Sequence, residues 1–162
     1  MRDLNIRAAT AADATTILQF ITELAIFEKA EHEVLTSVEM INDTLFTADA
    51  KAHALICEQG GSAIGFAVYF YNYSTWLGKY GLYLEDLYIT PDARRSGAGK
   101  ALFRALAKIA ADNDCGRFEW SVLDWNTPAI KFYQALEAQE KTEWIGYRLT
   151  EQQIKILANQ SE

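Results

Sequence analysis

A glycine-rich segment, Arg94–Lys100, has the residue types of an anion-binding loop and reads RRSGAGK. It follows a dense apolar run at 82–89 and precedes apolar residues at helical spacing over 102–110. The first N–H groups of a helix lack an internal partner and carry the positive end of its dipole, so they can bind phosphate oxygens. Gly97 and Gly99 leave this backbone uncovered, and the flanking arginines and lysine add positive charge. The segment therefore predicts a phosphate-binding loop.

Two well-known phosphate-binding loops do not fit this segment. A Walker A loop would need glycine in place of Arg94 and serine or threonine in place of Ala101, and the dinucleotide fingerprint would need a third glycine in place of Leu102. The plain alternative is a tight connection between a strand and a helix that binds nothing. The preceding arginines and the order of strand, turn and helix favour phosphate binding.

Two adjacent carboxylates, Glu85 and Asp86, interrupt the apolar run before the loop. Successive side chains of a strand face opposite ways, so only one of the two is expected to line a cleft. An ion pair with a neighbouring lysine or arginine is the alternative role, and it weighs more heavily for Asp86 than for Glu85. Glu85 is therefore the stronger candidate for proton transfer.

The composition is that of a folded chain of 162 residues, half of them hydrophobic, and it predicts a single domain over 1–162. No apolar run is long enough to span a membrane, and the first ten residues lack the apolar core of a signal peptide. The net charge of −7 disfavours nucleic-acid binding and suits a cationic partner. Cys57 and Cys115 form no disulfide framework or zinc site, and His32 and His53 lack metal-binding companions. We therefore expect no metal and a cytoplasmic setting.

The hydrophobic periodicity predicts an α/β fold, with an α+β mixed sheet that has helices on its faces. The expected elements are a strand at 4–8, a helix at 10–29 with a Thr10/Asp13 capping box, a helix at 38–46 capped by Thr36 or Ser37, strands at 53–58 and 62–71 joined by a turn at 59–61, a loop at 72–79, a strand at 82–89, the helix after the glycines, a strand at 118–123, a helix capped by Asn126 and reaching about residue 136, a strand at 144–149 and a helix at 150–157. The simplest topology is three antiparallel strands followed by a crossover unit.

With these elements in order, the segment Arg94–Gly99 resembles the Arg/Gln-x-x-Gly-x-Gly/Ala signature of the GNAT superfamily of acetyl-CoA-dependent N-acetyltransferases. Within it, the chain resembles the diamine acetyltransferase family over almost its full length, through the segments IRAATAAD, ELAIFEK, IGFAVYFYNYSTWLGK, LYLEDLYITPDARRSGAGK and VLDWNTPAIKFYQALEAQ. Residues 27–29, 74–76 and 122–126 are more similar to the thialysine acetyltransferase branch than to the spermidine/spermine branch. The resemblance implies the GNAT acyl-CoA N-acyltransferase fold, with a central, mostly antiparallel sheet flanked by helices.

The resemblance implies acetyl-CoA as the co-substrate. Its pyrophosphate would lie on the backbone of Arg95–Lys100, and its pantetheine arm would pair with Leu87–Ile89 and be flanked by Asn126–Ala129. Asn126 also reads as a plain helix cap. The cofactor-binding residues expected on this basis are Leu87, Tyr88, Ile89, Arg94, Arg95, Ser96, Gly97, Ala98, Gly99, Lys100, Asn126, Thr127, Pro128, Ala129 and Tyr133.

The catalytic residues implied by the resemblance are Tyr133 and Glu85. An alkyl amine has a pKa near 10.4, so a proton must leave before the amine can attack a thioester. An ordinary glutamate is a weak base, so Glu85 is expected to act through water or to orient the ammonium. The N–H of Leu87 would stabilise the oxyanion, and the Tyr133 hydroxyl would protonate the CoA thiolate. Without the family, Tyr133 would read as a core aromatic residue beside Phe132.

The amine-binding residues implied by the resemblance are Phe27, Glu28, Glu85, Glu119, Trp120 and Ser121. An acidic lining suits a small cationic amine. Phe27 lacks the hydroxyl found at this position in the spermidine/spermine branch, which argues against a long polyamine. Glu137 also departs from the relatives, which usually have glycine here as a left-handed cap.

The sequence thus predicts an N-acetyltransferase for a small amine, either a thialysine- or lysine-like amino acid or a diamine, with direct transfer because neither cysteine has a basic setting. The alternatives are acetylation of a protein or peptide amine and a CoA-binding sensor without turnover. The presence of both Glu85 and Tyr133 argues against the sensor, and the bulky Trp76 loop favours a confined pocket over an open groove. The resemblance further implies a homodimer, for which the aromatic strands and Trp144 offer apolar surface. No nucleic-acid or membrane partner is expected.

Overall fold

A computed structural model describes residues 3–160, and these residues fall into two compact units that meet between Leu123 and Asp124 in the sequence. The first contains β1 (Leu4–Ala8), η1 (Ala11–Asp13), α1 (Ala14–Phe27), η2 (Glu31–Glu33), α2 (Val38–Leu45), β2 (Ala52–Gln59), β3 (Ser62–Ser74), β4 (Lys79–Ile89), η3 (Pro91–Ala93), α3 (Ala98–Asp112) and β5 (Arg117–Trp120), where η marks a short 3-10 turn. The second contains α4 (Thr127–Gln134) and α5 (Glu151–Ala158).

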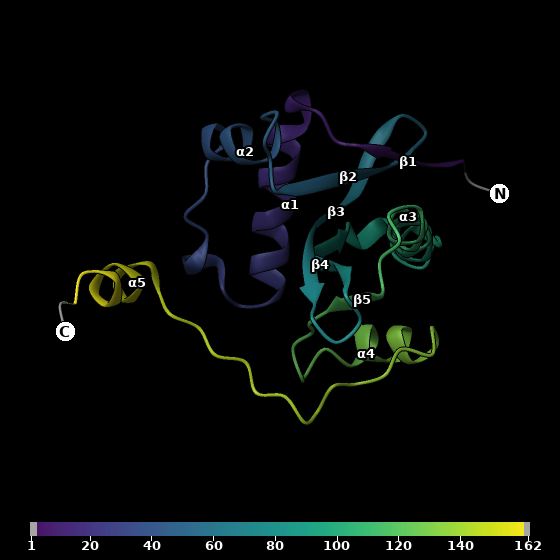
Figure 1. Cartoon of the computed structure of the whole chain (residues 1–162). Helices are drawn as coiled ribbons and strands as arrows, with labels where there is room; N and C mark the ends of the chain where they lie inside the picture. Colours follow the sequence, from purple (N-terminus) through teal and green to yellow (C-terminus); the bar gives the residue numbers. More distant parts are fainter. Residues whose placement is uncertain (1–2, 161–162) are drawn as a thin grey trace. The chain divides into compact units, whose positions relative to one another are not determined.

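The five strands form one sheet in the order β1-β2-β3-β4-β5. The first four run antiparallel to their neighbours, and β5 is parallel to β4, to which it is joined through α3. Figure 1 shows α1 and α2 on one face of this sheet and α3 on the other. The predicted mixed α/β fold, with antiparallel strands followed by a crossover unit, is confirmed.

The core lies on both faces of the sheet and holds β4 between two layers of side chains. On the α1 face, Ile17 and Phe20 pack in one cluster with Phe66 on β3 and Tyr88 on β4. On the α3 face, Leu82 of β4 and Leu102 and Leu106 of α3 are fully buried. Each such side chain contributes about 1.5 to 3 kcal/mol through burial, so β4 is a rigid support for the residues that it carries.

Local signals fix both ends of α1. The turn η1 leads into the helix, and at its start the carboxylate of Asp13 accepts a hydrogen bond from the Thr10 N–H at 2.7 Å, which confirms the predicted capping box. The α-helix itself begins at Ala14, four residues after the predicted start. Hydrogen bonds from Arg7 hold the pKa of Asp13 down at about 2, so this carboxylate is charged at neutral pH. At its end, Lys29 takes a left-handed conformation with φ 61°, and the N–H of Ala30 donates to the carbonyl of Ala25 at 2.8 Å. The helix therefore ends at Phe27, two residues before the predicted boundary.

The ends of two predicted strands and the existence of a third strand were also wrong. The strand β3 continues to Ser74 because residues 72–74 pair with β4, so the predicted loop at 72–79 shrinks to 75–78. The strand β5 ends at Trp120 rather than 123. The predicted strand at 144–149 is absent, because its apolar alternation finds no partner edge among residues 3–160. The single domain over 1–162 stays a prediction.

Candidate active site

A β-bulge in β4 lies at the two carboxylates of the candidate site. The register with β3 pairs Val68 with Asp86 and then Tyr69 with Leu84, so Glu85 has no partner residue on β3. A bulge re-aims side chains and breaks the strict alternation of a strand. The expectation that Glu85 and Asp86 must face opposite ways, which rested on that alternation, therefore does not apply here.

Among the carboxylates of this region, Asp86 has the pKa that is shifted furthest from its ordinary value. It is half-buried, and burial raises the pKa of Asp86 to about 6, with the negative charges of Glu85 and Glu28 adding to the effect. No ion pair involves Asp86 among the described residues, which removes the role that the sequence had favoured for it. Glu85 is exposed. A carboxylate with a raised pKa accepts a proton more readily near neutral pH, so Asp86 is better suited to be a general base than an exposed carboxylate such as Glu85.

The end of α1 contributes two of the residues that were expected to bind an amine. Phe27 is the last residue of the helix and is 38% exposed, and Glu28 follows it. Burial raises the pKa of Glu28, and its charge in turn raises the pKa of Asp86. The structure thus brings Glu28, Glu85 and Asp86 together from two elements that lie about sixty positions apart in sequence.

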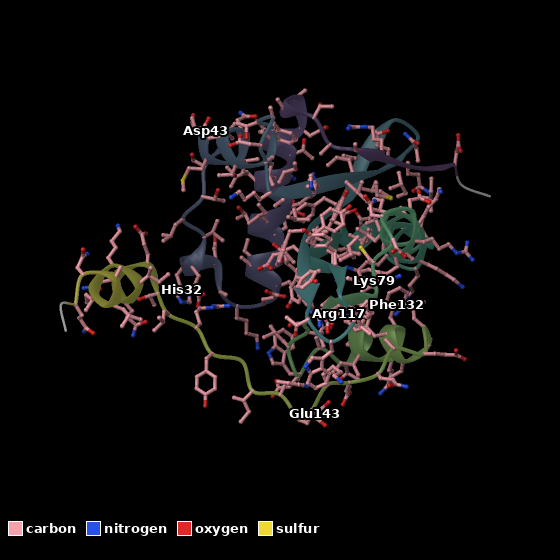
Figure 2. All side chains as sticks on the ribbon, in the orientation of Figure 1. His32, Asp43, Lys79, Arg117, Phe132 and Glu143 are labelled. Carbon is pink, nitrogen blue, oxygen red and sulfur yellow. The ribbon has the colours of Figure 1, made fainter. Side chains whose placement is uncertain are left out.

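The three expected residues at the end of β5, Glu119, Trp120 and Ser121, do not share one environment. Glu119 forms an ion pair with Arg117 at 2.9 Å, which Figure 2 labels on this strand, and accepts a hydrogen bond from Asn72 at 3.3 Å. The hydroxyl of Ser121 lies 2.8 Å from that of Tyr83. Trp120 instead packs against Phe103 of α3, with the two ring centroids 5.0 Å apart. Glu119 and Trp120 therefore point to opposite faces of the sheet.

One edge of β4 is open beyond the bulge. The strand β5 pairs with β4 only as far as Leu84, and no other strand among residues 3–160 follows along Leu87–Ile89 on that side. The N–H of Thr90 donates to Ile64 on β3 at 2.9 Å, and because neighbouring residues point to opposite edges, the backbone groups of Leu87 and Ile89 face the open edge. An extended ligand could pair with this backbone, as the sequence predicted.

The glycine-rich loop has the geometry of an anion site. Gly97 caps α3 with φ 93°, and a Cβ placed on either Gly97 or Gly99 would meet no atom within 4 Å. Ser96 accepts a hydrogen bond from the N–H of Ala98, which leaves the later first-turn N–H groups of α3 unpaired within the helix. The side chains of Arg95 and Lys100 are exposed and form no ion pair with any residue in the range 3–160. This loop fits a phosphate-bearing ligand.

Arg94 points elsewhere. Its guanidinium carbon lies 5.3 Å from the ring centroid of Phe27 and 5.8 Å from that of Tyr88, and its Nε donates to the carbonyl of Ile89 at 3.2 Å. The first arginine of the loop thus contacts α1 and β4, whereas the sequence analysis predicted that its side chain would bind the phosphates.

The second unit carries the remaining candidates. Asn126 caps α4 by accepting a hydrogen bond from the N–H of Ala129 at 3.4 Å, and Pro128 lies in the first turn, which confirms the predicted helix start. Tyr133 lies on the same helix, with its ring 5.6 Å from that of Phe132. Glu137 has φ 61°, so the position that favours glycine is indeed left-handed.

Neither the raised pKa of Asp86 nor the contact of Arg94 with Phe27 was predicted from the sequence. The bulge that re-aims Asp86 depends on the register with β3, and no residue type in the sequence signals it. Among the described residues, no cluster of three or more His, Cys, Asp or Glu side chains could hold a metal ion. No helix among them is both long and apolar enough to cross a membrane.

Comparisons with known proteins bear on this site. The model of the acetyltransferase (GNAT) family matches residues 18–137. The chain is 35% identical to a thialysine N-epsilon-acetyltransferase from Mus musculus, over 98% of this chain and 99% of that protein. It is 46% identical to an L-ornithine N5-acetyltransferase from Arabidopsis thaliana, over 53% of this chain and 38% of that protein.

A solved structure gives independent support for the fold. An integron cassette protein from the mobile metagenome of V. cholerae superimposes with a TM-score of 0.80, at 22% identity, over 97% of this chain and 98% of that one. At this identity the match supports the fold alone.

Proposed function

The chain belongs to the acetyltransferase (GNAT) family and is an acetyl-CoA-dependent N-acetyltransferase, and we propose that it acetylates the side-chain amine of a small basic amino acid, thialysine- or lysine-like, or of a diamine. The observation that carries this proposal is the grouping of Glu28, Glu85 and Asp86 beside the open edge of β4. Three carboxylates favour a cationic acceptor. The names of two relatives, a thialysine N-epsilon- and an ornithine N5-acetyltransferase, support a terminal side-chain nitrogen as the acceptor atom.

We propose that the loop Arg95–Lys100 holds the pyrophosphate of acetyl-CoA and that the backbone of Leu87 and Ile89 pairs with its pantetheine arm. The uncovered glycines, the unpaired cations and the open edge of β4 support this assignment. Bound acetyl-CoA supplies the acetyl group as an activated thioester. The residues Asn126–Ala129 of the second unit would flank the same arm, as the resemblance implies.

For proton transfer, we propose that Asp86 receives the proton of the ammonium, with Glu85 and Glu28 orienting it. The hydroxyl of Tyr133 would protonate the departing thiolate. Transfer would be direct, since Cys57 is buried and burial raises its pKa to about 11, which leaves it a poor nucleophile. Burial also raises the pKa of Cys115.

A substrate panel tests the proposed acceptor. Thialysine, lysine, ornithine, a diamine, spermidine and a set of peptides would each be incubated with acetyl-CoA, and the release of free CoA would be measured. We expect the largest kcat/KM for the basic amino acids or the diamine and a lower value for spermidine. Fast peptide turnover without small-amine activity would overturn the proposal, and acetyl-CoA binding without turnover of any amine would point to a sensor.

Replacing Gly99 with Ala is expected to change stability and cofactor affinity in opposite directions. The new Cβ meets no atom of the protein, and alanine in a helix is more stable than glycine by about 0.5 to 1 kcal/mol, so the free energy of unfolding should rise. A methyl group that holds a phosphate off the backbone weakens a charged hydrogen bond worth about 1.5 to 3 kcal/mol, so affinity should fall by roughly tenfold or more.

Urea denaturation and calorimetric titration with CoA measure the two effects of Gly99→Ala. Ala107→Gly, at an exposed position far along the same helix, is the matched control: it should lower the free energy of unfolding by a similar amount and leave CoA affinity unchanged. Unchanged CoA affinity in the Gly99 variant would show that no phosphate approaches this backbone.

We further propose a homodimer, one catalytic domain that includes both units, and a cytoplasmic location. Aromatic side chains on β3 and β4, among them Tyr73 and Tyr80, are exposed and could be covered by a second copy. The family match from residue 18 to 137 spans the boundary between the units and supports a single domain. Light scattering at several protein concentrations tests the dimer, and a strict monomer would contradict it.

A further inference from the structure

Arg94 joins the cofactor loop to the end of α1. It is the first residue of the loop Arg94–Lys100, yet its guanidinium lies over the rings of Phe27 and Tyr88, at 5.3 Å and 5.8 Å from their centroids. A guanidinium within about 6 Å of a ring centroid is attracted by the electrons of the ring face. No ion pair with Arg94 occurs within residues 3–160, so its charge is not held by a carboxylate. The contact with Phe27 is therefore the connection between the loop and the proposed amine site.

The same end of α1 has a second attachment, to β4. The hydroxyl of Tyr88 donates to Glu23 at 2.8 Å, and Gln19 donates to the other oxygen of Glu23 at 2.8 Å. Burial, together with Glu23, raises the pKa of Tyr88 to about 12, so the hydroxyl keeps its proton at neutral pH. The helix is thus attached to β4 one turn before its end, and its last residue contacts the loop through Arg94.

The loop itself has a conformation that a ligand would stabilise. Arg95 has φ 65° and Gly97 has φ 93°, and a left-handed arginine is unfavourable without support. An anion that binds only this conformation shifts the loop population toward it. The backbone of Arg94 is continuous with these residues, so an ordered loop also fixes where its guanidinium lies.

We propose that Arg94 is a positioning residue that couples the two substrate sites, so that acetyl-CoA bound at the loop orders Phe27 and Glu28 and strengthens amine binding. This inference rests on the proposed binding of CoA at Arg95–Lys100. Because coupling between sites is reciprocal, a bound amine would strengthen CoA binding by the same factor. The enzyme would then bind its amine best when the acetyl donor is already present.

Hydrogen exchange measured by mass spectrometry tests this coupling without any amine. In the native sequence, CoA should slow the exchange of amides at 95–100 and also at 24–28. In Arg94→Gln, saturating CoA should still protect 95–100 but no longer protect 24–28. Lys100→Gln is the matched control, because it also removes one positive charge from the loop: it should need more CoA for saturation and then protect both segments.

Binding of thialysine, measured with and without CoA, gives a second readout. We expect CoA to tighten thialysine binding by roughly three- to tenfold in the native sequence and by less than about twofold in Arg94→Gln. Arg94→Lys keeps the charge but loses the planar group, so it should retain part of the coupling, and it replaces the glutamine variant if that one does not fold.

The two proposals fail in different ways. If Arg94→Gln weakens CoA binding as much as Lys100→Gln does and still transmits protection to 24–28, Arg94 is an ordinary phosphate contact and the coupling is overturned. If CoA does not protect 95–100 in the native sequence, the proposed cofactor loop fails, and the coupling fails with it.

Discussion

Replacing Tyr133 with Phe is expected to lower kcat by roughly 10² to 10⁴, the usual contribution of a well-placed general acid. The variant keeps the ring and its packing beside Phe132 on α4 and loses only the hydroxyl. Without a proton donor, CoA must leave as a thiolate anion. The tetrahedral intermediate then breaks down to products more slowly. Steady-state kinetics with the best amine of the panel measures the effect.

Binding of CoA is the control for the Tyr133 variant. Calorimetric titration should give a dissociation constant close to that of the native sequence, because the proposed contacts with the pyrophosphate and the pantetheine arm are made by other residues, and the hydroxyl acts only at the sulfur. An unchanged kcat would instead show that Tyr133 only packs beside Phe132, which is the role that the sequence suggests when the family resemblance is left aside.

The second large effect is expected for Asp86→Asn, with a loss of roughly 10² to 10⁴ in kcat/KM. The pKa of Asp86 is raised to about 6, and a base acts only when it is unprotonated, so native kcat/KM should fall more steeply as the pH drops below about 6. The asparagine variant cannot titrate, so the change of slope near pH 6 should disappear. A pH profile of kcat/KM between pH 5 and pH 8 would measure both.

Glu85→Gln and Glu28→Gln are the matched controls for Asp86. Both negative charges raise the pKa of Asp86, so removing either one should move the change of slope to lower pH without abolishing it. If the slope change survived in Asp86→Asn and vanished in Glu85→Gln, Glu85 would be the base that the sequence had favoured.

Much of the fold was predictable from local patterns. The capping box at Thr10 and Asp13, the cap by Asn126 and the helix after the glycines all follow from short-range chemistry that a sequence displays directly. The predicted strand at 144–149 failed because alternation describes only one side of a pairing, and a strand also needs a partner edge.

The candidate site was predictable in its residue types but not in its geometry. The motif drew attention to Arg94 and to the pair Glu85 and Asp86. Which carboxylate is perturbed depends on a bulge set by the register with β3, and the direction of Arg94 depends on the rings of Phe27 and Tyr88. Both are tertiary effects. They are the reason why we propose Asp86 as the base in place of Glu85, to which the family resemblance points.

The product formed from a mixture of amines tests the proposed acceptor most directly. Thialysine, ornithine, a diamine, spermidine and lysine-containing peptides would compete in one reaction with acetyl-CoA, with mass spectrometry and NMR locating the new acetyl group. We expect acetylation of a small amine, on the terminal side-chain nitrogen where the acceptor is an amino acid. Acetylation of the peptides alone, or of an α-amino nitrogen, would contradict it.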